Sequence, residues 1–131
     1  MKHVLNCTLA LTLILSLSGC ATVKTARNFE GIRVEDGAKP VASVAIENYG
    51  YYLFGFIPLI AGEPRYPNAP ICTLFSDSVT AQNNMMMLAK TAQKTGAKKV
   101  VNLRVYESWT GSFSFWLIWQ KQLYTGALLT E

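Results

Sequence analysis

Histidine is nearly absent from the sequence, and cysteine is scarce. The single histidine is His3, and the three cysteines are Cys7, Cys20 and Cys72. With no imidazole after residue 3, the rest of the chain cannot build a Ser-His-Asp triad, a Cys-His dyad or a histidine metal site. We therefore expect a protein that is not an enzyme and binds no metal or other cofactor, with Cys72 buried as a small apolar side chain.

Charged side chains are also few, at 15% of the residues. Lysine and arginine number 12 and the acidic residues 8, and the basic residues form no stripe. Nucleic-acid-binding domains concentrate basic residues on one face, so we expect no nucleic-acid partner. Half of the residues are apolar, which is typical of a folded domain and not of a disordered chain.

The sequence does have an N-terminal targeting segment. Lys2 is followed by an apolar run over residues 4–17, which is too short and too interrupted by polar residues for a membrane-spanning helix. A positive residue, a short apolar run and then small residues are typical of a cleaved signal peptide. The run ends in Leu17-Ser18-Gly19-Cys20, which resembles the lipobox of bacterial lipoproteins at all four positions.

The lipobox resemblance implies a covalent lipid anchor. It implies signal cleavage between Gly19 and Cys20, a diacylglycerol on the Cys20 sulfur and an acyl chain on the freed amine. Two or more acyl chains hold a protein stably on a bilayer, whereas one chain binds marginally. Ala21, in place of an aspartate, implies the periplasmic face of the outer membrane if the host is Gram-negative. Membrane lipid is then the first expected partner, and an envelope protein is a further candidate.

Three parts of the chain differ in composition. We expect a lipoprotein signal peptide over residues 1–19, a lipidated N-terminus and flexible tether over 20–38, and one small domain over 39–131. The fold class predicted for this domain is α+β, with one helix packed on a small, mostly antiparallel sheet of three to four strands. The expected order is strand–strand–helix–strand–strand, with strands at 41–46, 51–57, 99–107 and 113–129, the helix at 78–95, and a proline-rich loop at 62–70.

The predicted helix has a start signal, a buried face and a stop signal. Ser76-Asp77-Ser78 offers side-chain oxygens that can cap its N-terminus. Apolar residues recur at the spacing of one helix face, at positions Met85, Leu88, Ala89 and Ala92. Gly96 is the residue type that ends helices in the left-handed conformation.

Aromatic residues crowd the second and the last predicted strands. By alternation, Trp116, Ile118 and Tyr124 fall on the same face of the last strand. Because only one face of the sheet packs on the helix, this second face is a candidate interaction surface. The alternative is that the aromatic residues complete the core or are covered by the tether.

Several short stretches resemble the TRL-like family of small lipoproteins. They are Leu53-Phe54-Gly55-Phe56, residues 89–101, Tyr106-Glu107-Ser108 and Tyr124-Thr125-Gly126. The resemblance implies the lipoprotein class and an envelope location, and it implies no activity. The leading expectation is therefore a non-enzymatic interaction or structural lipoprotein. The alternative is a small-ligand or metal-binding module with a pocket between helix and sheet near Cys72.

Overall fold

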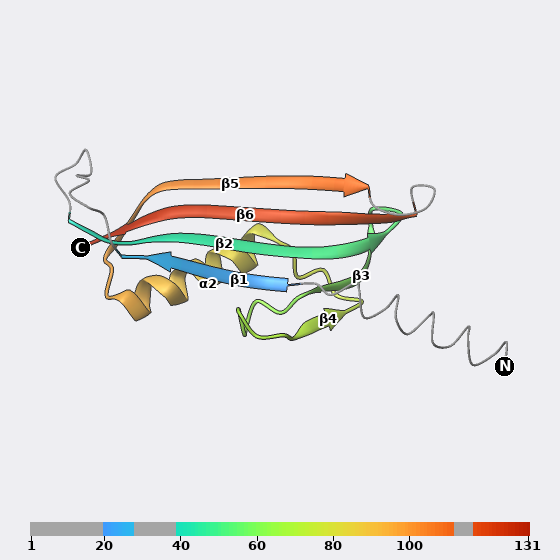
Figure 1. Cartoon of the computed structure of the whole chain (residues 1–131), viewed down its shortest axis with the longest axis horizontal. Coiled ribbons are helices and arrows are strands. Elements are labelled where there is room, and N and C mark those ends of the chain that lie inside the picture. Colours follow the sequence, from blue (N-terminus) through green and yellow to red (C-terminus); the bar gives the residue numbers. More distant parts are fainter. Residues whose placement is uncertain (1–19, 28–38, 112–116) are drawn as a thin grey trace, which may run out of the picture.

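The computed structural model describes residues 20–27, 39–111 and 117–131. In chain order its elements are β1 (Cys20–Ala26), β2 (Pro40–Leu53), β3 (Ile57–Gly62), β4 (Cys72–Leu74), α2 (Ala81–Thr95), β5 (Lys99–Gly111) and β6 (Ile118–Thr130) (Figure 1). The predicted signal peptide and its cleavage position after Gly19 lie outside the described residues, as do residues 28–38 of the predicted tether.

The described strands form one antiparallel sheet of six strands. The order is β4-β3-β2-β6-β5, and β1 also pairs with β2. β1 pairs with residues 43–49 of β2 and β3 with residues 50–53, so these two strands follow one another along the same edge of β2.

The α+β prediction, with one helix on three to four strands, is wrong, because the fold is mostly sheet and has a single short helix among the described residues. Two strands account for the difference. β1 lies where we expected the start of a flexible tether, and β4 lies directly after the predicted loop. Neither has an alternating sequence of its own, and each is held by pairing with a longer strand.

β2 is continuous where the sequence predicted two strands, at 41–46 and 51–57, with a break or bulge at residues 48–50 between them. Gly50 is not a break. A Cβ at this position would lie 2.8 Å from both the Ala61 Cβ and the Ile60 carbonyl oxygen, so glycine allows β3 to approach closely. The chain turns instead at Phe54 and Gly55, and Pro58 lies inside β3 beside a register shift.

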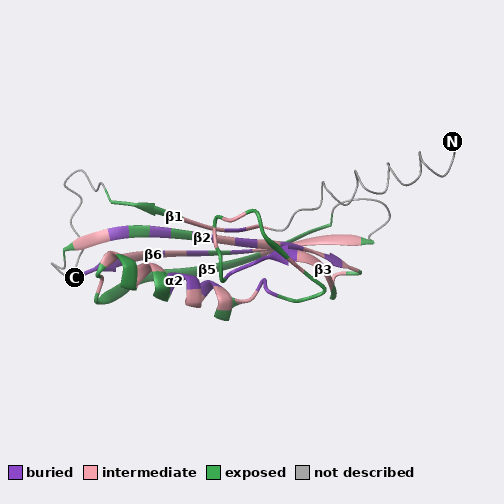
Figure 2. Ribbon diagram, turned by 90° about the horizontal axis from the view of Figure 1, so that it is seen from below, coloured by how far each residue is buried: buried purple, intermediate pink, exposed green. Residues whose placement is uncertain are grey.

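α2 covers one face of the sheet, which we call the helix face. No other described helix packs on the opposite face, which we call the open face (Figure 2). Side chains of β2 alternate between these faces, with Val44 and Ile46 buried and Ser43 and Ala45 exposed. The main core lies between α2 and the sheet and contains Ala21, Ala42, Val44, Ile46, Met87, Leu88, Ala127 and Leu129. A second cluster, nearer the β2–β3 hairpin, contains Tyr52, Ala61, Val79 and Leu123.

The helix ends where the sequence predicts and starts three residues later. Gly96 has a φ of 72° and its N–H caps the last carbonyl groups, which confirms the predicted stop. The N-cap is Thr80, whose Oγ1 accepts a hydrogen bond from the Asn83 N–H at 3.3 Å. The buried residues are Asn84, Met87 and Leu88, whereas the predicted core residue Ala89 is exposed. No described helix combines the length and the apolar run that a bilayer-spanning helix needs.

The sequence over residues 99–107 alternates in a way that predicts Val101, Leu103 and Val105 on one face of a strand, and β5 departs from this prediction. Its pairing with β6 shifts register between Val101 and Arg104, at Asn102, which has a φ of 53°. The shift places Val101 opposite Leu128 and Val105 opposite Thr125, so the two valines point to opposite faces.

Candidate functional site

Two of the three predicted surface residues lie on the open face. Ile118 is paired with Leu53 and Tyr124 with Glu47, an even number of positions apart on β6, so the two side chains share a face. They are six residues apart, which is about 20 Å along a strand, so they do not form one compact site. Trp116 lies outside the described residues.

Tyr124 belongs to a polar group at the middle of the open face. The Gln122 amide donates to the Glu47 carboxylate at 2.7 Å, and the Tyr124 hydroxyl donates to the same carboxylate oxygen at 3.2 Å. Desolvation is the main cause that raises the pKa of Tyr124, and the negative charge of Glu47 adds to it. The Tyr124 hydroxyl therefore stays protonated at neutral pH. It can donate and accept hydrogen bonds there, but it does not act as a base.

Sequence reasoning missed Glu47 and Gln122 in this group. The predicted strand at 41–46 stops one residue before Glu47, so no cross-strand partner was predicted for this residue. The alternation of β2 was the available signal, because Glu47 falls on the same face as Ser43 and Ala45.

Cys20 is the first residue of β1 and lies on the open face opposite Tyr49. Its thiol is partly exposed and adjoins the Tyr49 hydroxyl. The pKa of Tyr49 is raised, first by desolvation and then by the neighbouring Cys20 side chain. The sulfur therefore leaves the sheet on the side away from the helix and the core.

The backbone around Cys20 is tightly enclosed. A Cβ on Gly62 would lie 2.3 Å from the carbonyl carbon of Cys20 and 2.4 Å from the Ala21 nitrogen. On the outer edge of β1, the Asn68 side chain accepts from the Val23 N–H at 2.9 Å and donates to the Val23 carbonyl at 3.1 Å. Asn68 thus pairs with the outer edge of β1 as a neighbouring strand would.

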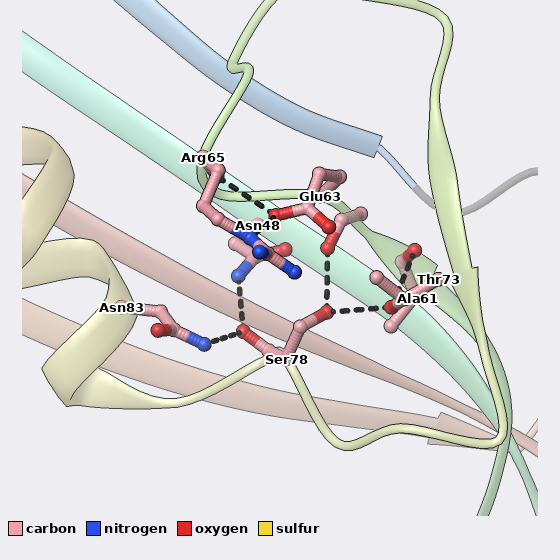
Figure 3. Close-up of polar contacts among 8 residues, drawn as sticks. Asn48, Ala61, Glu63, Arg65, Thr73, Ser78 and Asn83 are labelled. Atoms are coloured by element: carbon pink, nitrogen blue, oxygen red, sulfur yellow. Dashed lines mark hydrogen bonds and ion pairs between the residues drawn. The ribbon is translucent and has the colours of Figure 1, made fainter.

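A buried polar cluster connects the segment before α2 to the sheet (Figure 3). The Ser78 carbonyl accepts from the Asn48 and Asn83 amides, at 2.7 and 2.8 Å. The Ser78 hydroxyl donates to the Gly62 carbonyl at 2.5 Å and lies 3.2 Å from the Thr73 hydroxyl. These contacts join β2, β3, β4 and the helix start, although the buried Oδ1 of Asn48 has no hydrogen-bond partner among the described residues.

A groove of about 500 Å³ lies between α2, β1 and the loop before β4. Its lining residues are Val23, Thr25, Arg27, Arg65, Tyr66, Pro67, Asn68, Ala69, Thr91, Lys94 and Thr95. Three of them are basic, and Arg65 is paired with Glu63 at 3.1 Å. Hydrogen bonds from the backbone and side chain of Arg65 lower the pKa of Glu63.

Cys72 lies apart from this groove. The predicted burial of Cys72 is wrong, because the residue is exposed on β4, a three-residue strand at the end of the strand order. Among the residues that the structure describes, no group of three or more His, Cys, Asp or Glu side chains is placed to hold a metal ion.

No family model, curated protein or solved structure matches the chain. The resemblance to TRL-like lipoproteins stays a prediction. Function is therefore inferred from the residues and geometry of the chain itself.

Proposed function

We propose that the chain is a lipid-anchored, non-enzymatic protein of the bacterial cell envelope, attached through Cys20 to the periplasmic face of the outer membrane. The observation behind this proposal is the Leu17-Ser18-Gly19-Cys20 motif directly after the apolar run at residues 4–17. Cleavage before Cys20 would make it the first residue of the mature chain, with a sulfur and an amine available for acylation.

The position of Cys20 in the fold supports this chemistry. Its side chain is partly exposed on the open face, so a thioether can leave the sheet without crossing the core. Because Cys20 is also the first residue of β1, the anchor joins the folded sheet directly.

The open face supports an interaction role. Tyr124 is 39% exposed, and with Glu47 and Gln122 it offers a flat, hydrogen-bonding surface on the side of the sheet that α2 leaves uncovered. Ile118 extends this surface toward the β2–β3 hairpin. We propose an envelope protein as the partner of this face.

Replacement of Cys20 tests the anchor, and Cys72 provides a matched control. We expect Cys20→Ser to abolish incorporation of labelled palmitate and to leave an unprocessed chain whose mass includes residues 1–19. Cys72→Ser should still be labelled, processed and recovered with membranes. Palmitate incorporation that persists in Cys20→Ser would refute the proposal.

A small-ligand-binding module is the second candidate, and the groove at α2 favours it. Arg27, Arg65 and Lys94 give the groove a positive lining that suits an anionic ligand. Native mass spectrometry of protein purified from cells would then show a bound anion, and a spectrum of the bare chain would argue against this role.

A further inference from the structure

The end of the sheet at the β2–β3 hairpin exposes a cluster of large apolar side chains, at the right of Figure 1. We call this cluster the apolar tip, and its members are Phe54, Phe56, Ile57, Leu74, Phe75 and Leu117. Their exposed fractions range from 39% at Ile57 to 75% at Phe75. All three phenylalanines that the structure describes belong to the tip, and each is more than half exposed.

Strand pairing brings the members together from separate parts of the chain. Leu53 is paired with both Ile57 and Ile118, and the Phe54 N–H donates to the Leu117 carbonyl at 2.7 Å. Leu74 pairs with Ile60 near the same end, and the Phe75 N–H donates to the Leu59 carbonyl at 3.1 Å. The Phe54 and Phe56 rings are stacked, with centroids 6.2 Å apart.

The tip is also free of charge. Residues 48–62, 71–76 and 117–120 contain no aspartate, glutamate, lysine or arginine. An exposed group of large apolar side chains with no charge beside it is the composition of surfaces that contact lipid or protein.

Backbone conformation at the tip is a second, independent sign. Phe54 has a φ of 54° and Gly55 of 80°, which is the pattern of a type I′ hairpin turn, where asparagine is the favoured first residue. Phe75 also has a positive φ, of 53°. The other non-glycine residues with positive φ in the described chain are asparagines, which tolerate it. The tip therefore keeps two exposed phenylalanines in a conformation that disfavours them, which is typical of functional positions.

We propose that the apolar tip inserts into the interface of the bilayer that holds the Cys20 anchor, an inference that rests on the proposed lipid anchor. β1 begins at Cys20 on its tip-facing end and runs away from the tip (Figure 1). Cys20 is paired with Tyr49, four residues before Leu53 along β2, which is about 13 Å. An acylated Cys20 therefore brings the membrane surface to this end of the sheet.

The chemistry of the tip suits that surface. Aromatic side chains favour the membrane–water interface, and apolar groups of peripheral proteins enter it to a depth of about 5–10 Å. The acyl chains would hold the protein on the membrane, and the tip would fix its orientation, with the strands rising from the bilayer.

A fluorescent label at the tip tests this insertion in the full-length protein. An environment-sensitive thiol dye is attached to Phe56→Cys in a Cys72→Ser background, and the protein is placed in vesicles of phosphatidylethanolamine and phosphatidylglycerol. The control is Val100→Cys, which is 42% exposed and pairs with Leu129 at the opposite end of the sheet. We expect a blue shift and at least threefold stronger quenching by doxyl lipids at residue 56 than at residue 100.

Phe54→Asn separates membrane contact from folding. Asparagine suits the positive φ at this position, so the melting temperature should be unchanged or higher, while lipid quenching of the label at residue 56 should fall. A stable Phe54→Asn protein with undiminished quenching would overturn the proposal.

Equal quenching at residues 56 and 100 would also overturn the proposal. Absence of quenching at both residues would overturn it too, and this is the result expected if the tip binds a protein partner instead of lipid. The mass of the purified chain shows separately whether Cys20 is acylated. If it is not, the proposed anchor fails, and the same label comparison, in a chain that also has Cys7→Ser and Cys20→Ser so that the dye has one thiol to label, still decides whether the tip contacts lipid.

Discussion

At the scale of single residues, Tyr52 connects several parts of the structure. It is 2% exposed and belongs to the smaller core cluster. Its hydroxyl donates to the Asp77 carboxylate at 2.6 Å, which ties the segment before α2 to the sheet. The centroid of the Tyr52 ring lies 5.5 Å from that of the Trp109 ring. The Lys121 ammonium lies 6.0 Å from the centroid of the Tyr52 ring.

Tyr52→Phe should lower the unfolding free energy at neutral pH. It should also make the unfolding free energy fall less when the pH is raised into the alkaline range. Desolvation, followed by the hydrogen bond to Asp77, raises the pKa of Tyr52 above that of a free tyrosine. A tyrosine that is neutral in the folded state stabilises the protein fully below the unfolded pKa of about 10, and this contribution is lost as the pH rises further. Removing the hydroxyl should cost about 1–2 kcal/mol of unfolding free energy near pH 7.

Urea unfolding near neutral pH and at alkaline pH measures both effects. Tyr66→Phe is the control, because Tyr66 is 63% exposed and should leave the unfolding free energy nearly unchanged. Tyr49 and Tyr124 also have raised pKa values, so the alkaline loss should diminish in Tyr52→Phe without vanishing. An identical alkaline loss in Tyr52→Phe and the unmodified chain would contradict this assignment.

At the scale of elements, local signals predicted α2 well and the sheet poorly. Gly96 ends the helix because glycine adopts the left-handed conformation at low cost, and this can be predicted from one position. The helix start shifted because Ser78, predicted as part of a capping sequence, uses its hydroxyl and carbonyl to hold Gly62, Asn48 and Asn83 instead.

The missed strands depend on partners that are distant in sequence. β1 is held by β2 and by Asn68, which is 45 residues from Val23. No local pattern in residues 20–26 indicates that pairing, because the segment has no alternating sequence of its own. The role of Gly50 was missed for a similar reason. Glycine is needed there because Ala61 of β3 approaches closely, and that neighbour is distant in sequence.

Some parts of the candidate site could also be predicted from the sequence, and others depend on contacts between distant residues. The Cys20 motif and the shared face of Ile118 and Tyr124 follow from sequence order and strand alternation alone. The apolar tip could not be predicted, because Leu74 and Phe75 join Phe54 and Phe56 only through the pairing of β3 with β4.

Gly62→Ala should detach β1 from its place beside β3. The added Cβ would lie 2.3–2.6 Å from backbone atoms of Cys20 and Ala21, and backbone cannot move aside as a flexible side chain can. We expect a loss of about 2–4 kcal/mol in unfolding free energy, as in severe overpacking. Hydrogen exchange should show faster exchange at the amides of β1.

Gly126→Ala is the matched control in β6. A Cβ at Gly126 meets nothing within 4 Å, so this variant should be as stable as the unmodified chain or slightly more so. Equal stability of the two variants would mean that β1 does not pack against Gly62 as described.

At the scale of the whole molecule, an ion pair and further lysines lie at the end of the sheet opposite the uncharged apolar tip. The end of the sheet opposite the tip has Lys39 paired with Glu131 at 3.6 Å, and Lys98 and Lys99 lie near it. The basic groove lies along β1 and the C-terminal part of α2, on the helix face. Two different membrane contacts are therefore conceivable for one anchored protein, one through the apolar tip and one through the basic groove.

These contacts differ in their response to salt. Attraction of Arg27, Arg65 and Lys94 to anionic lipid would weaken strongly between about 0.05 and 0.5 M salt, because the Debye length shortens severalfold over this range. Insertion of uncharged phenylalanines should not weaken. We therefore expect lipid quenching of the residue-56 label to be constant over this range and unaffected by a combined Arg27→Gln and Lys94→Gln change. Quenching that falls with added salt, and equally with these two substitutions, would mean that the groove orients the protein on its membrane and that the tip is turned elsewhere.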